Sequence, residues 1–141
     1  MTFNLLWFED NLKNFDKIIP NIDAHLKEFH DRELDYDDHD HYPADFDVKL
    51  FEGKYSLALV DLNLSNGQKG VEIIEVLREN GAFIDILLYS NNPLELIELT
   101  EGANYVEGVF RHATMTGIEQ KIKDVIDQVL YKEMMVLERN K

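Results

Sequence analysis

Acidic and hydroxyl side chains stand at the ends of three apolar runs, where the chain would otherwise bury mainly carbon. Glu9 and Asp10 follow the run FNLLWF. Asp61 lies near the end of YSLALVDL, and Ser90 is the last residue of DILLYS. A polar group in such a place needs a reason, because an unpaired ionised group is costly to bury. These residues are therefore the first candidates for chemistry.

The candidates would meet if the three runs were neighbouring strands of a parallel sheet, because ligands bind beyond the carboxyl ends of such strands. Three carboxylates placed together repel one another, and each raises the pKa of the others. Mg²⁺ removes this repulsion, since it binds carboxylate oxygens while keeping several water molecules. The hydroxyl of Ser90 and a nearby cation would suit the oxygens of a phosphoryl group. The combination indicates phosphoryl transfer, with Asp61 as the candidate nucleophile.

The three apolar runs are continuous rather than alternating, which is typical of strands covered on both faces. The run GVF predicts a shorter strand, and ELDY predicts the weakest one. Arg111 and His112 follow GVF, and they are the candidate cations for the site. The five predicted strands cover residues 3–8, 33–36, 55–62, 85–90 and 108–110.

Helical patterns separate these strands. Pro20 interrupts the first one and should kink it or begin a new helix. A second helix is closed by Gly81, and a third begins at Pro93 and ends at Gly102. The apolar positions that define the first helical stretch, at steps of three and four residues, are Leu12, Phe15, Ile19, Ile22, Leu26 and Phe29. The helix before Gly81 carries Val71, Ile74, Val76 and Leu77, and the last helix runs from Thr116 to about Arg139.

Strands that alternate with helices predict a parallel sheet with right-handed crossovers. Five such units in one short chain favour a doubly wound, flavodoxin-like α/β fold. We expect a single domain over residues 1–131, with residues 132–141 extending the last helix. The acidic residues 31–47 should hold a short strand, a solvated loop and the start of a helix near Pro43. The sequence His39, Asp40 and His41 lacks the spacing of a calcium loop, so we interpret it as part of that loop.

Composition limits the classes of function. The chain has 141 residues, no cysteine and a formal net charge of −14. An acidic protein repels nucleic acid and anionic membranes, so neither is expected as a partner. The sequence has neither a signal-peptide pattern nor an apolar run long enough to cross a membrane. We therefore expect a cytoplasmic protein whose acidic site attracts cations.

The stretch ALVDLNLSNGQKGVEIIEVLRENG at residues 58–81 resembles the central strand, aspartate, loop and helix of receiver domains in two-component response regulators. The resemblance extends over about residues 3–130 and includes the acidic pair and the spacing from Asp61 to Ser90. It implies the five-stranded receiver fold and a Mg²⁺-dependent phosphoacceptor that takes part in signal transduction.

The resemblance also implies individual roles. Asp61 would accept the phosphoryl group, and Ser90 would hydrogen-bond to it and move with it. Asp10 would bind Mg²⁺ directly, and Glu9 would bind it through water. The backbone carbonyl of Asn63 would complete the protein ligands.

The sequence departs from the family at several positions. The family has a Lys-Pro pair after strand five, and this chain has Arg111 or His112 there; the spacing into the last helix favours Arg111. Arg is not equivalent to Lys, because its head is larger and planar. Gly108 then falls at the position of the family's switch aromatic, and Asn91 replaces a small residue that leaves room for the phosphoryl group.

The resemblance implies that a sensor histidine kinase or a phosphotransfer protein phosphorylates Asp61. The added charge would change the face formed by the fourth and fifth helical regions. An output protein or a second copy of the chain would bind that face or the C-terminal helix. The chain would not be an enzyme on other molecules, although it could slowly dephosphorylate itself.

Two alternatives remain open. The departures from the family are compatible with an atypical receiver that acts as an interaction or dimerisation module without phosphorylation. A Mg²⁺-dependent phosphohydrolase or nuclease would also place carboxylates at strand ends. The net charge and the lack of a second acid two residues after Asp61 disfavour this enzyme.

Overall fold

The computed structural model describes residues 1–40, 54–64, 67, 69–79, 84–100 and 110–139. Its strands are β1 (Thr2–Phe8), β2 (Glu33–His39), β3 (Leu57–Asp61), β4 (Asp85–Ser90) and β5 (Phe110–Thr114). Its helices are the 3₁₀ turn η1 (Leu12–Phe15), α1 (Ile18–His30), α2 (Gly70–Glu79), α3 (Pro93–Thr100) and α4 (Ile118–Arg139).

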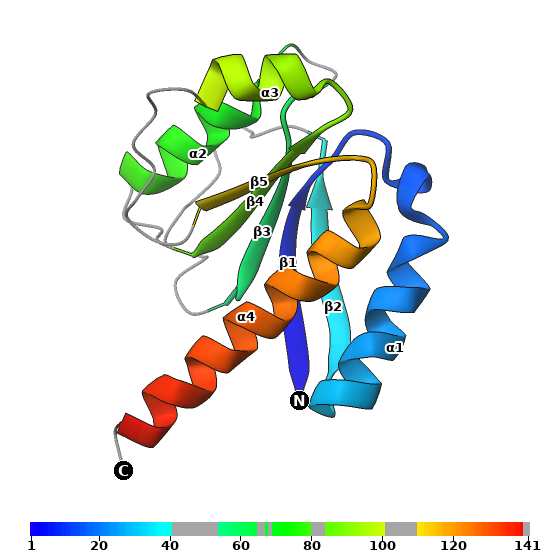
Figure 1. Ribbon diagram of the computed structural model, residues 1–141, viewed down its shortest axis with the longest axis vertical. Coiled ribbons are helices and arrows are strands. Elements are labelled where there is room, and N and C mark those ends of the chain that lie inside the picture. The colour runs from blue at the N-terminus through cyan, green and yellow to red at the C-terminus, as the bar shows by residue number, and fades with distance from the viewer. Residues whose placement is uncertain (41–53, 65–66, 68, 80–83, 101–109, 140–141) are drawn as a thin grey trace.

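The five strands form one parallel sheet in the order β2-β1-β3-β4-β5 (Figure 1). Strand order reverses beside β1, because the chain moves outward to β2 and then crosses back to β3. This is the doubly wound, flavodoxin-like fold that the sequence predicts. A binding site is expected at the carboxyl ends of β1 and β3, where the order reverses.

Each face of the sheet is covered by its own pair of described helices (Figure 1). Trp7, Leu59 and Tyr89 belong to the core shared with α1 and α4. Their neighbours Phe8 and Val60 belong to the core shared with α2 and α3. Because successive side chains of a strand point to opposite faces, the buried stretches of β1, β3 and β4 need apolar residues on both faces. This packing explains the continuous apolar runs and holds the ends of the central strands rigidly.

The first helical stretch is divided at its amino end. A 3₁₀ turn covers Leu12–Phe15, and α1 then begins at Ile18. Pro20 therefore lies in the first turn of α1, where its missing N–H costs no hydrogen bond. Phe29 departs from the expected apolar face, because 64% of its surface is exposed.

Strand β5 differs from its prediction. Within the described residues it covers Phe110–Thr114, whereas the sequence predicted a strand that ends at residue 110. It pairs with β4 alone at one edge of the sheet. Polar residues are tolerated in such a strand, so the pair Arg111 and His112 did not mark its end.

Other expectations concern the remaining boundaries. The second strand continues to His39, three residues beyond its prediction. The last helix begins at Ile118, after Gly117 with a φ of 74°, and continues to Arg139. The expected helix near Pro43 and the expected helix ends at Gly81 and Gly102 lie outside the described residues.

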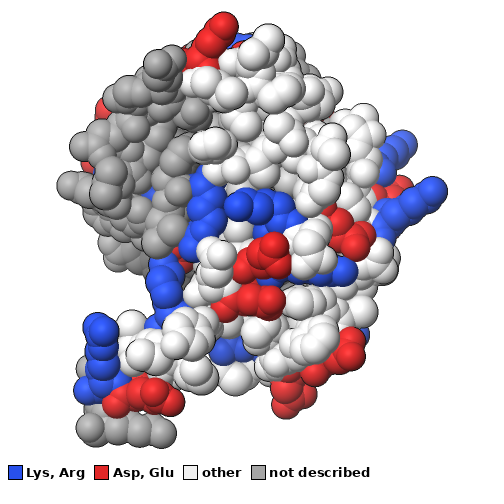
Figure 2. Space-filling model, in the orientation of Figure 1, with Lys and Arg blue, Asp and Glu red and all other residues white. Residues whose placement is uncertain are grey.

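None of the helices in the described part of the chain is both long and apolar enough to span a membrane. On the face covered by α1 and α4, Lys and Arg lie interspersed with Asp and Glu (Figure 2). Ion pairs account for part of this mixture, including Lys123 with Glu119 and Arg32 with Glu133. This face therefore carries mixed charge rather than a patch of one sign.

Candidate functional site

Three carboxylates meet at the carboxyl edge of the sheet. Asp61 is the last residue of β3, and Glu9 and Asp10 directly follow β1. Phe8 is paired with Val60, so the ends of these two strands lie side by side. A carboxylate oxygen from each of the three residues lies within 4.8 Å of the others. The structure thus brings together the acidic residues that the sequence singled out.

Two hydrogen bonds hold Glu9, and a third supports one of them. Its side chain is buried, and one oxygen accepts a 2.6 Å hydrogen bond from the hydroxyl of Tyr89. The other oxygen accepts a hydrogen bond from the backbone N–H of Asn11 at 3.1 Å. The indole N–H of Trp7 in turn donates to the Tyr89 hydroxyl at 2.9 Å. This relay fixes the position of Glu9 and leaves it little freedom to turn away from Asp61.

Burial and mutual repulsion raise the pKa of two carboxylates in the acidic cluster, Glu9 and Asp61. Burial and, to a smaller extent, the charge of Asp61 together raise the pKa of Glu9 to about 7, against the opposing hydrogen bond from Tyr89. Burial is also the largest cause of the raised pKa of Asp61, to which the charge of Asp10 contributes. The cluster therefore holds its negative charge at a cost, which a bound cation would remove.

The donor set fits Mg²⁺. Hard carboxylate oxygens are its preferred protein ligands, and it usually keeps several waters in addition. The cluster opens into a cavity of about 300 Å³, which has room for those waters and a small anion. The residues that line it are Glu9, Asp10, Asn11, Asn14, Phe15, Asp61, Asn63, Tyr89, Asn91 and Met115.

Ser90 and Asn63 flank Asp61 on two sides. Ser90 is buried at the end of β4, one residue beyond Tyr89, which is paired with Asp61. Its hydroxyl accepts a 3.0 Å hydrogen bond from the backbone N–H of Asn92. The backbone N–H of Asn63 donates to Asp61 at 3.0 Å. Asn91 is exposed and lines the cavity.

The predicted place of Arg111 is wrong. Arg111 is the second residue of β5 and is paired with Leu87, near the amino end of β4. Its guanidinium lies 3.6 Å from the carboxylate of Asp85, the first residue of β4, and Lys132 lies 2.7 Å from the same carboxylate. Arg111 therefore belongs to an ion-pair group at the amino-terminal end of β4, whereas the acidic cluster lies at the carboxyl ends of the strands.

The end of β5 offers a hydroxyl and a thioether instead of a cation. Thr114 is paired with Ser90, and Met115 follows it and lines the cavity. His112, the other candidate, is paired with Leu88 and precedes the end of β5 by two residues. The misplaced end of β5 in the sequence interpretation explains both errors.

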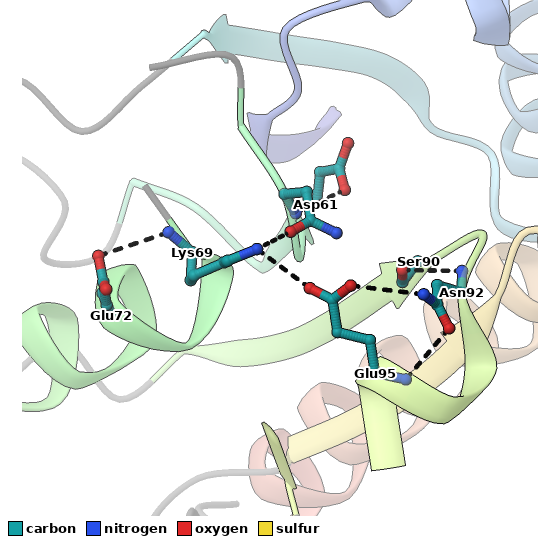
Figure 3. Close-up of polar contacts among 7 residues, drawn as sticks. Asp61, Lys69, Glu72, Ser90, Asn92 and Glu95 are labelled. Atoms are coloured by element: carbon teal, nitrogen blue, oxygen red, sulfur yellow. Dashed lines mark hydrogen bonds and ion pairs between the residues drawn. The ribbon is translucent and has the colours of Figure 1, made fainter. Parts of the chain in front are cut away.

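Lys69 is a residue that the sequence analysis missed. It lies in the loop between β3 and α2, and its ammonium group donates to the side-chain oxygen of Asn63 (Figure 3). The same ammonium forms an ion pair of 3.1 Å with Glu95 in the first turn of α3. Lys69 thus brings a positive charge to the neighbourhood of Asp61 from a different element than strand five.

A chain of polar contacts continues from Lys69 to Ser90 (Figure 3). The side-chain nitrogen of Asn92 lies 3.5 Å from the carboxylate of Glu95. The side-chain oxygen of Asn92 accepts a 3.2 Å hydrogen bond from the backbone N–H of Glu95. Asn92 also donates its backbone N–H to Ser90. A change at Lys69 can therefore reach the start of α3 through a short series of contacts.

Gly70 makes this placement of Lys69 possible. A Cβ at Gly70 would lie 2.5 Å from the backbone oxygen of Asp61 and 2.7 Å from a methyl group of Leu88. Only a residue without a side chain lets the loop approach the end of β3 so closely. The pair Lys69–Gly70 shortly after Asp61 was the available signal, because a glycine at such a close approach fixes the position of its neighbour.

Comparison with solved structures identifies the fold. A signal receiver domain from Vibrio parahaemolyticus matches 100% of this chain over 99% of its own length, with a TM-score of 0.63 at 13% identity. A response regulator receiver domain protein from Clostridium thermocellum matches 95% of the chain over 98% of its own length, with a TM-score of 0.60 at 13% identity. A response regulator from Colwellia psychrerythraea matches 94% of the chain over 99% of its own length, with a TM-score of 0.56 at 11% identity.

No protein-family model matches the sequence, and no curated protein matches it. The chain thus has the fold of response regulator receiver domains at a low level of sequence identity. Its acidic cluster lies at the edge of the sheet where a site is expected in such a fold.

Proposed function

We propose that this chain is a phosphoacceptor receiver in which Asp61 accepts a phosphoryl group. The observation that carries the proposal is the cluster of Glu9, Asp10 and Asp61 around one cavity at the switch point of a receiver fold. The similar structures described above are receiver domains, and they give no support to an enzyme of the phosphohydrolase or nuclease type. The chain changes its own aspartate and is not an enzyme for other substrates.

The donor is a phosphohistidine of a sensor kinase or of a phosphotransfer protein. An oxygen of the Asp61 carboxylate attacks the phosphorus, and the O–P bond forms as the P–N bond breaks. The electron pair of the broken bond stays on the imidazole nitrogen, which takes up a proton. The backbone N–H of Asn63 holds the Asp61 carboxylate in place during this transfer. The hydroxyl of buried Ser90 is held in turn by the backbone N–H of Asn92.

A divalent cation would be held by Glu9, Asp10, Asp61 and the backbone carbonyl of Asn63. When bound, Mg²⁺ supplies positive charge that lowers the repulsion between the carboxylates and the incoming phosphoryl oxygens. The raised pKa of Glu9, which comes mainly from burial and in part from the charge of Asp61, is compatible with this assignment, because a bound cation would stabilise the ionised carboxylate.

Lys69 provides the second positive charge. Its ion pair with Glu95 is partly exposed, and pairs of this kind are worth only about 0–1 kcal/mol. A phosphoryl group on Asp61 carries more charge than Glu95, so it can draw the ammonium away. Release of Glu95 then changes the first turn of α3. Helices α3 and α4 contact the edge strand β5 from opposite faces of the sheet, and the surface around β5 is what a kinase, an output protein or a second copy of the chain would sense.

Intact-mass spectrometry after incubation with acetyl phosphate and Mg²⁺ tests the proposal. The wild-type protein should gain the mass of one phosphoryl group, and Asp61→Asn should gain none. Asp35→Asn is a matched control on exposed β2 and should behave as wild type. Absence of the adduct in wild type, together with absence of binding by a beryllofluoride mimic, would contradict the proposal and favour a phosphorylation-independent interaction module.

A further inference from the structure

A cluster of metal-binding side chains joins α1 to α4, away from the acidic cavity. His25 and His30 lie on α1, and Asp127 lies on α4. The Nε2 atoms of both histidines lie 2.7 Å from the same carboxylate oxygen of Asp127. Ligand atoms from all three residues lie within 4.8 Å of one another. We propose that these three residues bind a divalent transition-metal ion such as Zn²⁺.

The chemistry of the donors distinguishes this cluster from the acidic site. Two imidazole nitrogens and one carboxylate oxygen are ligands that Zn²⁺ takes in proteins, at about 2.0–2.2 Å. Mg²⁺ prefers oxygen ligands alone, so the two sites select different ions. A water molecule would complete four ligands, because three protein ligands leave one tetrahedral position free.

Without a metal ion, both histidine rings contact the same oxygen atom of Asp127. One oxygen of Asp127 accepts from both rings only if each ring carries its proton on Nε2. Partial burial raises the pKa of Asp127, but the hydrogen bonds from His30 and His25 outweigh it and lower the pKa below its ordinary value. The carboxylate is therefore ionised at neutral pH. A metal ion between the three atoms would use this charge and both nitrogen lone pairs.

The local structure of α1 aims both rings at Asp127. His30 is the last residue of α1, and Asp31 ends the helix in a left-handed conformation with a φ of 53°. The ring of His25 lies 5.0 Å from the ring of Phe29 and 5.8 Å from that of His30. Phe29 thus packs beside a candidate ligand, which gives a reason for its departure from the core. Apolar neighbours of a metal site limit the access of solvent to the bound ion.

The cluster is open enough to admit an ion. The exposed fractions of the side chains are 13% for His25, 22% for His30 and 46% for Asp127. The two helices lie side by side on one face of the sheet (Figure 1), and ligands on both would let a bound ion clamp one to the other. A ligand that binds the folded state alone raises its stability in proportion to the logarithm of ligand concentration.

Isothermal titration of the untagged protein with Zn²⁺, in excess Mg²⁺, tests the site. Wild type should bind one equivalent in a saturable manner and gain thermal stability. His30→Gln and Asp127→Asn should lower the affinity by at least about tenfold, and Asp124→Asn, an exposed residue on the same helix, should leave it unchanged. Zn²⁺ binding that both cluster variants retain, or no saturable binding by wild type, would overturn the proposal.

Imidazole NMR of the wild-type protein gives a readout that does not depend on variant folding. Substoichiometric Zn²⁺ should shift the ring resonances of His25 and His30 and leave those of His112, on β5, unchanged. The Asp61→Asn protein should show the same shifts, because its substitution lies in the other site. Failure of both cluster histidines to respond to Zn²⁺ would overturn the proposal even if the phosphoacceptor function were established.

Discussion

The hydroxyl of Tyr89 donates a hydrogen bond of 2.6 Å to Glu9 and accepts one of 2.9 Å from Trp7, so one buried oxygen connects the core to the acidic cluster. Loss of this hydroxyl leaves the indole N–H of Trp7 without its partner, at a cost of about 1–3 kcal/mol. It also removes an interaction that lowers the pKa of Glu9. We expect Tyr89→Phe to unfold at lower urea concentration and to bind Mg²⁺ more weakly near neutral pH.

Tyr131→Phe is the control for that substitution, because Tyr131 is exposed on α4. Urea unfolding and Mg²⁺ titration should show no change for it. Wild-type Mg²⁺ affinity in Tyr89→Phe would mean that the relay serves packing alone.

Stability in Mg²⁺-free buffer should depend on the ionisation of Glu9. Its pKa is about 7 in the folded protein against a usual value of 4.5. The folded state therefore holds a proton that the unfolded state has lost, and the resulting stability is present below pH 4.5 and is lost as the pH rises to about 7. The difference corresponds to about 3 kcal/mol. The raised pKa of Asp61 acts in the same direction.

Urea unfolding at a series of pH values, with EDTA present, measures this dependence. Wild type should lose stability relative to Glu9→Gln across that window, since the amide cannot ionise. Saturating Mg²⁺ should reduce the difference in pH dependence between the two proteins, because in wild type the cation takes the place of the proton. Equal pH profiles for the two proteins without Mg²⁺ would show that Glu9 ionises freely in the fold.

Lys69 should affect the rate of phosphorylation more than stability. Its partly exposed ion pair with Glu95 contributes little to folding. Lys69→Met removes a positive charge beside Asp61, and we expect phosphorylation by acetyl phosphate to slow by about tenfold, or about 1.4 kcal/mol. Glu95→Gln keeps the ammonium group of Lys69 but removes its ion-pair partner, so phosphorylation should proceed at least as fast as in wild type.

The rate at which the phosphoryl adduct appears, measured by mass spectrometry, tests both expectations. Lys27→Met serves as the control, since Lys27 pairs with Asp23 on the surface of α1. An unchanged rate in Lys69→Met would assign the ammonium to loop structure only.

Gly70→Ala should be among the more damaging small substitutions. Its Cβ would lie 2.5 Å from the backbone oxygen of Asp61, so either the loop or the end of β3 must shift. Overpacking of this kind costs about 3 kcal/mol. We expect lower stability and slower phosphorylation together, because the shift moves both Lys69 and Asp61.

Gly67→Ala separates steric contact from backbone strain. Gly67 has a φ of 85° but no atom within 4 Å of a built Cβ. Its substitution should cost about 1–2 kcal/mol through the left-handed backbone alone and leave the phosphorylation rate close to wild type. Urea unfolding and adduct formation, measured on both variants, test this contrast; equal effects would contradict it.

The three central strands could be predicted because burial on both faces gives each of them a continuous apolar run. That pattern is sufficient to place Asp61 and Ser90 at strand ends. Strand β5 lies at the edge, where polar residues such as Arg111 are tolerated, so its sequence did not show where it ends. Its carboxyl end is set by pairing of Thr114 with Ser90, which is a tertiary contact.

The contacts around the acidic cluster were not predictable for a related reason. By its sequence pattern Tyr89 is one more apolar residue of a buried strand, although its hydroxyl lies against Glu9, which is distant along the chain. Lys69 has the pattern of a surface lysine in a loop, and its ammonium meets Glu95 only because α3 packs nearby. Sequence patterns report burial and period well, but they do not report which side chains meet across elements.

Strand β2 lies at the other edge of the described sheet and carries a row of exposed acids, namely Glu33, Asp35, Asp37 and Asp38. The outer edge of a sheet can pair with a strand of another molecule and begin aggregation. Like charges along that edge repel a second copy, so the acidity of β2 protects the protein in concentrated solution.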